Sequence, residues 1–405
     1  MNQGRRTWPL FAGAAAGIGI YGIAFAILGT VLGLPQMEAR LHLTTALKGN
    51  VFLLLYVGVF LSNALTGPFI EALGSKLVLA FSAVMVSVSL LWFSGLTSFS
   101  AAASAAMLLG FGGGTLNVAV NALVSDLYPT RRGSMLNLLG VFFGVGALSI
   151  PFAAATLLSH LTISHLFMLA ATLPAAVAVY YVLLSFPCQQ IKRGLPLLDA
   201  ARVLRLPGVM QIGILLFFEN ADEAVIAAWT SIYVISLGCK PHTATVILGC
   251  YWASMMVGRV IASQLIKRIS KMKIILGATA GAIAGCTLLF VSREPITLAF
   301  AVVVTGLSFA PIFKTTLSIA GDRHPQATAP IFGVVFAMSL LGAMGAPWIV
   351  GQISQHYSIR LGPLVPILGS VCVGIMALLI ARSQRLDFGP KDAVKSITLT
   401  ESSAA

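Results

Sequence analysis

The sequence predicts an all-α membrane protein with twelve transmembrane helices arranged in two six-helix halves. The first observation is composition: 58% of the 405 residues are apolar and 9% are charged, whereas soluble domains carry about 25% charged residues. The second is that the apolar residues come in blocks such as 10–35 and 77–96, each near the roughly 20 residues that cross about 30 Å of hydrocarbon. The third is that basic residues gather in alternate loops, as in proteins that cross a membrane repeatedly.

Twelve predicted spans account for the apolar blocks. The blocks do not alternate polar and apolar residues, which excludes a β-barrel. The first block follows Arg5 and Arg6, but it is longer than the apolar region of a signal peptide and further spans follow at once, so we expect this helix to be retained. The spans are expected at residues 10–34, 48–70, 76–96, 99–126, 133–158, 163–186, 208–236, 243–268, 272–292, 296–320, 327–354 and 361–382.

The basic residues predict that both chain ends lie on the cytoplasmic side. With the N-terminus inside, 18 Lys and Arg residues fall on the inner side and 5 on the outer side, while Arg259 and Lys314 lie within spans and complete the 25. Basic side chains resist translocation, so this bias sets the orientation. The inner residues are Arg5, Arg6, Lys76, Arg131, Arg132, Lys192, Arg193, Arg202, Arg205, Lys267, Arg268, Lys271, Lys273, Arg323, Arg382, Arg385, Lys391 and Lys395; the outer residues are Arg40, Lys48, Lys240, Arg293 and Arg360.

The longest polar break divides the spans six and six. It runs over residues 187–207, which we expect to form a cytoplasmic linker between an N-terminal bundle at 1–186 and a C-terminal bundle at 208–383. The remaining segment, 384–405, is polar, and we expect a disordered cytoplasmic tail.

An internal repeat supports this division. Residues 110–114 in span 4 resemble residues 306–310 in span 10, at an offset of 196. Residues 141–151 in span 5 resemble residues 335–347 in span 11, at offsets of 194 to 196. Two glycine-rich helices recurring at nearly one offset indicate duplicated halves, an architecture in which transporters bind substrate near the bilayer midplane. The alternative is that membrane helices are rich in glycine whatever their origin.

The loop after span 2 carries a recognisable motif. Residues 67–76 read Gly-Pro-Phe-Ile-Glu-Ala-Leu-Gly-Ser-Lys. This resembles the signature of the major facilitator superfamily, with Glu71 in place of the usual Asp. The resemblance implies a conformational latch formed by Gly67, Glu71, Gly74 and Lys76, because glycines permit close helix approach and a tight turn. The alternative is an ordinary short cytoplasmic turn.

Three further stretches resemble the fucose–galactose–glucose:proton symporter family within that superfamily. They are the glycine–asparagine pattern of span 4, residues 136–147 of span 5 and residues 306–313 of span 10. The resemblance implies movement of a sugar coupled to protons. Relatives often carry an acid where Asn117 stands, so the usual proton site of the N-terminal half is missing here. They also often carry a proline where Lys314 stands in the C-terminal half.

The acids are concentrated in span 7 instead. Glu219, Asp222 and Glu223 are the three carboxylates deep inside the predicted spans, and Glu219 and Glu223 share a helix face. A charge at this depth costs at least about 2.5 kcal/mol, so it has to be paired, neutralised or hydrated. Arg259 and Lys314 are the available partners, which leaves at least one carboxylate unpaired. We hypothesise that Glu223 or a neighbour exchanges the coupling proton; a structural ion-pair cluster is the alternative.

Amides and aromatic rings are the candidate substrate ligands. An amide both donates and accepts hydrogen bonds, which suits sugar hydroxyls, and aromatic faces suit the apolar face of a sugar ring. Interhelical bonding of the amides and packing of the aromatics are the alternatives. The candidates are Asn117, Asn121, Asn137, Phe142, Phe143, Asn220, Trp229, Tyr251 and Trp252.

Together these features predict a secondary active transporter that moves a hexose or similar polyol by alternating access, coupled to protons or alternatively sodium. We expect a multi-pass monomer in the bilayer of the cell (inner or plasma) membrane, with no cofactor, no metal and no nucleic-acid partner, since the net charge of +13 follows the membrane topology. No catalytic cluster or nucleotide loop is evident, so an enzyme is not expected. A proton-coupled exporter of drugs or metabolites and a non-transporting receptor or scaffold are the alternatives.

Overall fold

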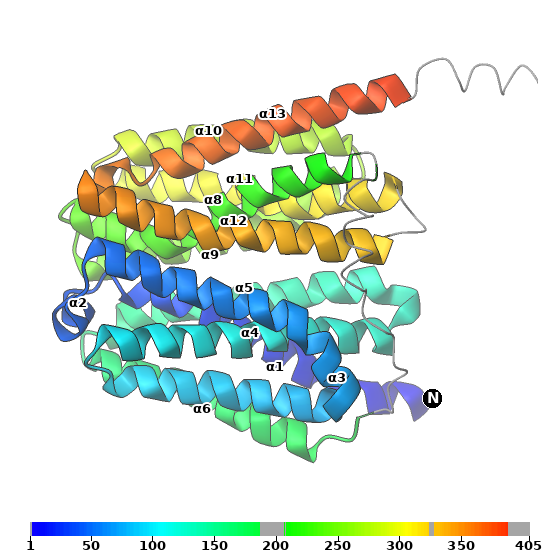
Figure 1. The fold of residues 1–405 in the computed structure, drawn as a ribbon, viewed down its shortest axis with the longest axis horizontal. Helices are drawn as coiled ribbons and strands as arrows, with labels where there is room; N and C mark the ends of the chain where they lie inside the picture. The colour runs from blue at the N-terminus through cyan, green and yellow to red at the C-terminus, as the bar shows by residue number, and fades with distance from the viewer. Residues whose placement is uncertain (1, 187–205, 207, 324–327, 388–405) are drawn as a thin grey trace, which may run out of the picture.

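A computed structural model describes residues 2–186, 206, 208–323 and 328–387, and these residues fold into α-helices joined by short turns (Figure 1). The helices of the first group are α1 (Asn2–Val31), α2 (Pro35–Leu41), α3 (Thr45–Gly95), α4 (Phe99–Leu127), α5 (Arg132–Leu157) and α6 (Ile163–Leu183). Those of the second group are α8 (Val209–Ser236), α9 (Pro241–Leu265), α10 (Lys271–Val291), α11 (Pro295–Arg323), α12 (Thr328–His356) and α13 (Leu364–Asp387). Single 3₁₀ turns, η1 (Pro129–Arg131) and η3 (Ile359–Leu361), precede α5 and α13.

Helix α3 contains two of the predicted spans. Its 51 residues would measure about 76 Å at 1.5 Å per residue, more than twice the hydrocarbon thickness. The helix is broken at Gly74, whose φ of 78° and ψ of 154° are not helical. Residues with a Cβ atom rarely adopt this conformation, so the glycine lets the chain turn back at this point.

The prediction of twelve spans is therefore confirmed. In the described ranges, ten helices are long and apolar enough to cross a membrane. Helix α3 is one of these ten and contributes two spans, and α8 has comparable length but carries three carboxylates. The main differences from the predicted boundaries are in the first and last helices: α1 begins at Asn2 rather than near 10, and α13 continues to Asp387 rather than ending near 382.

The helices form two groups that lie side by side. In Figure 1 the segments coloured blue to cyan-green occupy the lower part of the molecule, and those coloured green to red occupy the upper part. Each group contributes most of one buried apolar cluster, but the first cluster also includes Trp229 and Val350 of the second group, and the second includes Ala26 and Ala147 of the first. Helix α1 begins and α13 ends at the same end of the bundle, which we call the termini side; the other end is the opposite side. Apart from Leu206, residues 187–207 of the predicted linker lie outside the described residues, as do residues 388–405 of the predicted tail.

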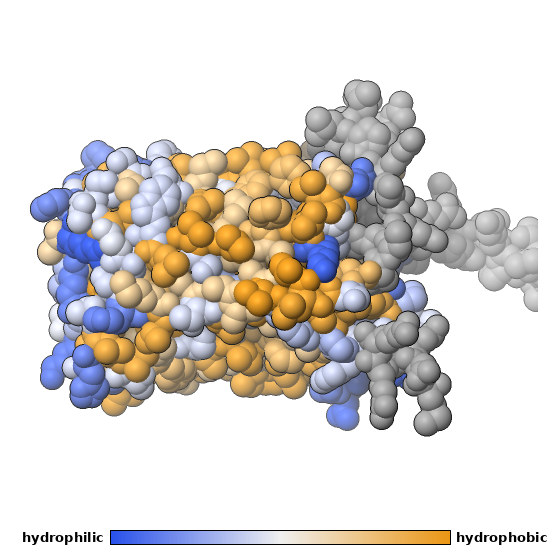
Figure 2. Space-filling view, turned by 90° about the horizontal axis from the view of Figure 1, so that it is seen from below, coloured by the Kyte–Doolittle hydropathy of each residue, from blue (hydrophilic) through white to orange (hydrophobic). Residues whose placement is uncertain are grey.

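The outer surface suits a lipid environment. Large apolar side chains are exposed along the helices, among them Phe81, Leu183 and Phe300, at 60%, 77% and 60% exposure. Figure 2 shows apolar residues over the middle of the visible face and hydrophilic residues at its two ends. In water such a surface would drive aggregation, whereas in a bilayer it faces acyl chains.

A short helix on the opposite side was not predicted. Helix α2 begins with Pro35 at its first turn, a position where proline is favoured because its missing N–H needs no partner. Arg40 ties this helix to the α3–α4 turn, since its guanidinium donates to the backbone oxygen of Ser94 at 2.8 Å. Lys48 at the start of α3 is buried and forms an ion pair with Glu38 of α2. Two of the five outer basic residues are thus anchored at this surface.

Candidate functional site

A large cavity lined by both polar and apolar residues lies between the two helix groups. It encloses about 1100 Å³ of empty space, including the part that is open to solvent. Its lining comes from α1, α3, α4 and α5 on one wall and from α8, α9, α11 and α12 on the other. The polar lining residues are Tyr21, Tyr56, Asn63, Asn117, Asn121, Asn220, Glu223, Arg259, Lys314 and Ser339.

The lining residues lie in the middle of the bundle and in its half nearer the termini side. Helix α5 starts on the termini side at Arg132, and its lining residues fall between Leu136 and Phe143, in the first half of the helix. Helix α11 ends on that side at Arg323, and Phe309 to Lys314 lie in its second half. The cavity therefore extends from mid-membrane depth toward the termini side.

The charged residues of the lining all belong to the second group of helices. Glu223 of α8, Arg259 of α9 and Lys314 of α11 face the cavity, and the charges of both basic groups act on the Glu223 carboxylate. Within the described part of the chain, no ion-pair contact joins these residues. Lys314 lies deep in the molecule but its side chain remains exposed, because it faces the cavity.

Arg259 reaches toward the other wall. Its guanidinium carbon lies 5.7 Å from the centre of the Phe143 ring in α5, a cation–π contact across the boundary between the two groups. One terminal nitrogen also lies 3.4 Å from the sulfur of Met255. Neither contact neutralises the guanidinium charge.

The other two carboxylates of α8 are not in the cavity. Glu219 and Asp222 are 0% and 1% exposed and do not belong to the lining. Asp222 Oδ2 accepts a hydrogen bond of 2.9 Å from the Ser370 hydroxyl of α13, and Gly369 is packed so closely against Asp222 that a Cβ atom there would overlap the carboxylate. Neither carboxylate oxygen of Glu219 has a hydrogen-bond partner among the described residues. The three acids therefore occupy three different environments.

Three of the predicted asparagines line the cavity. Asn121 donates to the backbone oxygen of Asn117 at 2.7 Å and to its side-chain oxygen at 2.9 Å. Asn220 donates to the Ser339 hydroxyl at 3.4 Å, linking α8 to α12. These bonds orient the amides while leaving part of their donor and acceptor capacity free.

Several predicted ligands lie elsewhere. Asn137 is exposed but is not part of the cavity lining, and Phe142 packs edge-on against Phe11 of α1. Tyr251 and Trp252 are buried behind the wall, with Trp252 contacting the lining residue Phe143 at a centroid distance of 6.0 Å. Residues on a helix face adjacent to the lining face can be equally polar or aromatic, so the sequence alone did not separate them.

Sequence reasoning missed part of the lining. Tyr21 and Phe25 of α1, Tyr56 and Asn63 of α3 were not among the predicted ligands, although all four line the cavity. The sequence contained a pattern that indicates two of these residues. Tyr21 and Phe25 are one helical turn apart in α1. The other face of this helix is rich in glycine and packs against α5, for example where Gly22 contacts the backbone of Phe143.

The two groups meet closely on the opposite side. A Cβ atom on Gly351 of α12 would lie 2.8 Å from the Cα atom of Gly49 in α3, so only glycine permits this approach. Beside it, the indole nitrogen of Trp348 donates to the side-chain oxygen of Asn50 at 3.0 Å. The contact closes the cavity toward this side.

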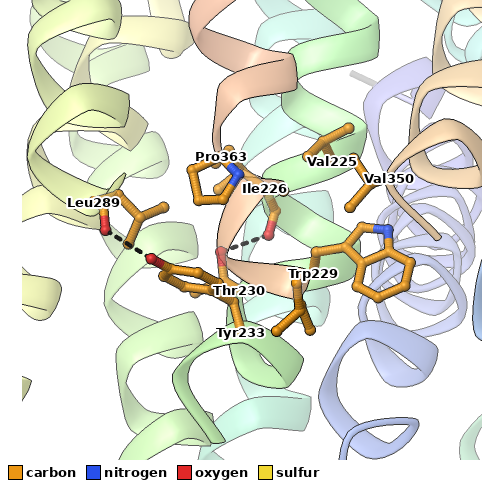
Figure 3. A pocket seen from close by; sticks show the side chains of 10 residues that line it. Val225, Ile226, Trp229, Thr230, Tyr233, Leu289, Val350 and Pro363 are labelled. Atoms are coloured by element: carbon orange, nitrogen blue, oxygen red, sulfur yellow. Dashed lines mark hydrogen bonds between the residues drawn. The ribbon is translucent and has the colours of Figure 1, made fainter. Parts of the chain in front are cut away.

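Trp229, another predicted ligand, belongs to the same closure. Its indole N–H donates to the backbone oxygen of Pro347 at 3.0 Å, and its ring lies 5.9 Å from that of Phe52 in α3. Figure 3 shows Trp229 beside Val350, near a small apolar pocket that also includes Val225. This tryptophan therefore packs where the two groups seal.

The predicted latch lies at the break in α3 on the termini side. Gly74 is the residue with positive φ at the break, and Gly67 has open space around its Cα atom. Glu71 is exposed and Lys76 is half-buried; in the described ranges Glu71 has no ion-pair partner. None of the four residues lines the cavity.

The sequence is similar to a known protein family and to several named proteins. Residues 14–329 match the family profile of the Major Facilitator Superfamily. A protein TsgA homolog from Citrobacter koseri is 22% identical over 360 residues, covering 88% of this chain and 89% of the relative. The purine ribonucleoside efflux pump NepI from Shigella dysenteriae is 23% identical over 318 residues, covering 76% and 80%.

Solved structures share the fold at low sequence identity. The nucleoside transporter NupG superposes with a TM-score of 0.75 at 14% identity, covering 94% of this chain and 99% of that one. A D-xylose-proton symporter superposes with a TM-score of 0.75 at 15% identity, covering 92% and 97%.

Proposed function

The chain belongs to the Major Facilitator Superfamily, and on this premise we propose that it carries a hexose or a similar polyhydroxylated molecule across the membrane by alternating access, coupled to protons. Membership of the superfamily makes it a multi-pass membrane transporter of a small molecule, not an enzyme. The substrate and the coupling ion are the proposed part.

The chemistry of the cavity carries the proposal for the substrate. Its polar groups include four amides and two tyrosines, which together offer donors and acceptors for several hydroxyls. Phe25, Phe143 and Phe313 supply apolar surfaces for a ring. Ligand pockets typically enclose about 300–1,000 Å³, so the cavity has room for a sugar and water. The resemblance of spans 4, 5 and 10 to sugar–proton symporters agrees with this assignment.

Two structural neighbours are named as carriers of polyhydroxylated molecules. One structural neighbour is a D-xylose-proton symporter and another is a nucleoside transporter. A nucleoside contains a ribose, so both substrates combine hydroxyls with a ring. This pattern favours hydroxyl recognition without naming the sugar.

Alternating access is consistent with the asymmetry of the bundle. The cavity extends toward the termini side and is closed on the opposite side by the Gly49–Gly351 approach. Rocking of the halves would open that contact and close the termini side. The bias of 18 inner to 5 outer basic residues supports a cytoplasmic location for both chain ends in the cell membrane.

Glu223 is the residue that we propose for proton coupling. Among the described residues it is the carboxylate that lines the cavity, where water and protons have access. Ionisable groups at membrane depth mark proton and substrate pathways. Asn117 stands where members of the sugar–proton symporter family often carry an acid. Coupling through Glu223 would therefore place the proton-exchanging acid in the second half of the chain rather than in the first. Glu219 and Asp222, both buried away from the cavity, are secondary candidates.

Export is the second candidate function. One relative is named a purine ribonucleoside efflux pump, and alternating access operates in either direction. An exporter would exchange its substrate for protons across the same cavity. The direction of transport relative to an imposed proton gradient separates the two candidates.

Two measurements test the proposal. Thermal-shift screening of the purified protein against hexoses, polyols, nucleosides and amphipathic drugs should give stabilisation by polyhydroxylated ligands. Uptake of the stabilising ligand into liposomes should then follow an inward proton gradient. Stabilisation by drugs alone, or uptake indifferent to the proton gradient, would overturn the proposal.

A further inference from the structure

We propose that the substrate carries a carboxylate in addition to its hydroxyls, as hexuronic and aldonic acids do, and that Lys314 and Arg259 bind this group. The inference rests on the proposed function, because it describes the substrate class of the same cavity. It goes beyond a neutral hexose or polyol, which would place no charge beside these residues.

The charges of the lining do not balance. Lys314 and Arg259 contribute two positive charges, and Glu223 contributes one negative charge when it is ionised. The remaining polar lining residues of the described chain are amides, phenols and a hydroxyl. Glu219 and Asp222 are buried in the packing behind the wall rather than in the cavity. The cavity therefore presents at least one excess positive charge.

Lys314 gives the strongest support for an anionic substrate. Its ammonium group has no hydrogen-bond or ion-pair partner among the described residues, and its side chain is exposed to the cavity. While the cavity is open, water solvates this charge. When the cavity closes around a substrate, Lys314 and Arg259 would have only the Glu223 carboxylate between them to balance two positive charges at membrane depth, which is costly. A carboxylate on the substrate removes this cost and forms a charge-assisted hydrogen bond.

Arg259 suits the same group. Its guanidinium carbon lies 5.7 Å from the centre of the Phe143 ring, a cation–π contact that leaves its N–H donors without a carboxylate partner among the described residues. The planar donor edge matches the two oxygens of a carboxylate. Arg259 and Lys314 belong to neighbouring helices of one wall, opposite Asn117 and Asn121 on the other. A hydroxylated acid would thus meet cations at one end and amides at the other.

The arrangement also offers a route to coupling. Glu223 shares the cavity lining with Tyr21 of α1, Tyr56 of α3, Arg259 and Lys314, and its charge also acts on the buried Glu219 and Tyr251. When Glu223 takes up a proton, the cavity gains one positive charge, and a monoanionic substrate restores the previous balance. Proton and anion therefore favour each other's binding, and by linkage the effect is reciprocal. One proton and one monoanion together carry no net charge.

Binding by the purified full-length protein tests the substrate class. Glucuronate, gluconate, glucose and glucose 6-phosphate serve as probes at matched ionic strength, with affinity measured from thermal shifts. We expect the wild-type protein to bind glucuronate or gluconate at least about tenfold more tightly than glucose. We expect Lys314→Gln to remove this preference and Lys314→Arg to retain most of it.

Lys267→Gln is the matched control. Lys267 is an exposed lysine beyond the end of α9, bonded to Gln264 at 3.1 Å, so its loss should leave the preference unchanged. The comparison of glucuronate with glucose uses the wild-type protein alone, so it tests the inference even if Lys314→Gln is unstable. Equal affinity for glucose and glucuronate would overturn the inference while leaving the proposed function intact. Preference for glucose 6-phosphate alone would overturn the carboxylate assignment. If the protein bound a drug but none of these four probes, both the inference and the proposed function would be wrong.

Transport into liposomes tests the charge balance. Uptake of the bound acid should follow an imposed pH gradient and should not respond to a membrane potential set with potassium and valinomycin. Uptake driven by the potential at constant pH would contradict the coupling described here.

Discussion

The two walls of the cavity differ in chemistry. The wall from α1, α3, α4 and α5 presents amides, phenols and phenyl rings, and within the described lining it carries no charged residue. The wall from α8, α9, α11 and α12 carries Glu223, Arg259 and Lys314. Each half therefore brings a different kind of interaction to one binding space: the first suits hydroxyls and rings, and the second suits charge. Substitutions on the two walls should have different consequences.

The largest expected effect on transport comes from a substitution in the charged wall. Glu223→Gln should reduce proton-driven uptake into liposomes to the level of protein-free vesicles, because the amide cannot exchange a proton at this position. Exchange of labelled for unlabelled substrate, which needs no net proton movement, should persist. Glu294→Gln, at an exposed position on the opposite side, is the matched control and should behave as wild type. Unchanged proton-driven uptake by Glu223→Gln would remove the carboxylate from the coupling mechanism.

A second effect tests whether the two walls have to come together. Gly351→Leu should strongly reduce transport, because even a Cβ atom there would lie 2.8 Å from the Cα atom of Gly49 and a larger side chain would wedge the halves apart. In the Gly351→Leu variant, the cysteine introduced by Asn50→Cys should react faster with a thiol reagent added on the opposite side than the same cysteine does when Gly351 is retained. Gly277→Leu in α10, where the Cβ atom would meet nothing within 4 Å, serves as the control. Full transport by Gly351→Leu would indicate that this closure is dispensable.

A smaller effect is expected on the uncharged wall. Asn117→Ala should raise the KM about tenfold with proton coupling intact, since one neutral hydrogen bond contributes about 1–1.5 kcal/mol. Asn137→Ala removes the same amide from a position outside the lining and should leave KM unchanged. If the two alanine variants were equally impaired, the assignment of the wall to hydroxyl binding would be wrong.

The smallest effect concerns the Asp222 carboxyl group, which is buried behind the wall. Ser370→Ala should lower the free energy of unfolding by about 1 kcal/mol, because it removes the 2.9 Å bond to Asp222. Asp222→Asn keeps an acceptor oxygen and should preserve proton-driven uptake. Thermal denaturation in detergent and uptake assays measure the two outcomes. Loss of coupling in Asp222→Asn would show that proton exchange is not confined to the cavity-lining acid.

Part of the site could be predicted from sequence because membrane helices restrict polar residues. Glu223, Arg259 and Lys314 stand out in apolar spans, and charges at that depth need water or partners. All three line the cavity. Asn117, Asn121 and Asn220 were identified for the same reason. Polar residues within apolar spans can therefore be identified as candidate cavity residues before the packing of the helices is known.

Other predicted site residues lie outside the cavity lining, because their placement depends on which helix face meets which neighbour. Glu219 and Glu223 share a face by helical spacing, but only the second reaches the cavity. Trp229 has the composition of a sugar-stacking residue but packs against α12 and α3 on the opposite side. Four residues along a helix rotate a side chain by only about 40° but shift it by about 6 Å, and the sequence does not say where along the helix surface the cavity begins and ends.

The sequence by itself determined the membrane class, the number of spans and the reversal of the chain at Gly74. These follow from the length of apolar segments and from backbone geometry, both of which are local properties. Tertiary structure decided which polar residues share one water-accessible space and which are sealed into the packing, as for Glu223 and its neighbour Asp222. That choice depends on contacts between helices far apart in the chain, such as α8 with α13, and no local pattern encodes it.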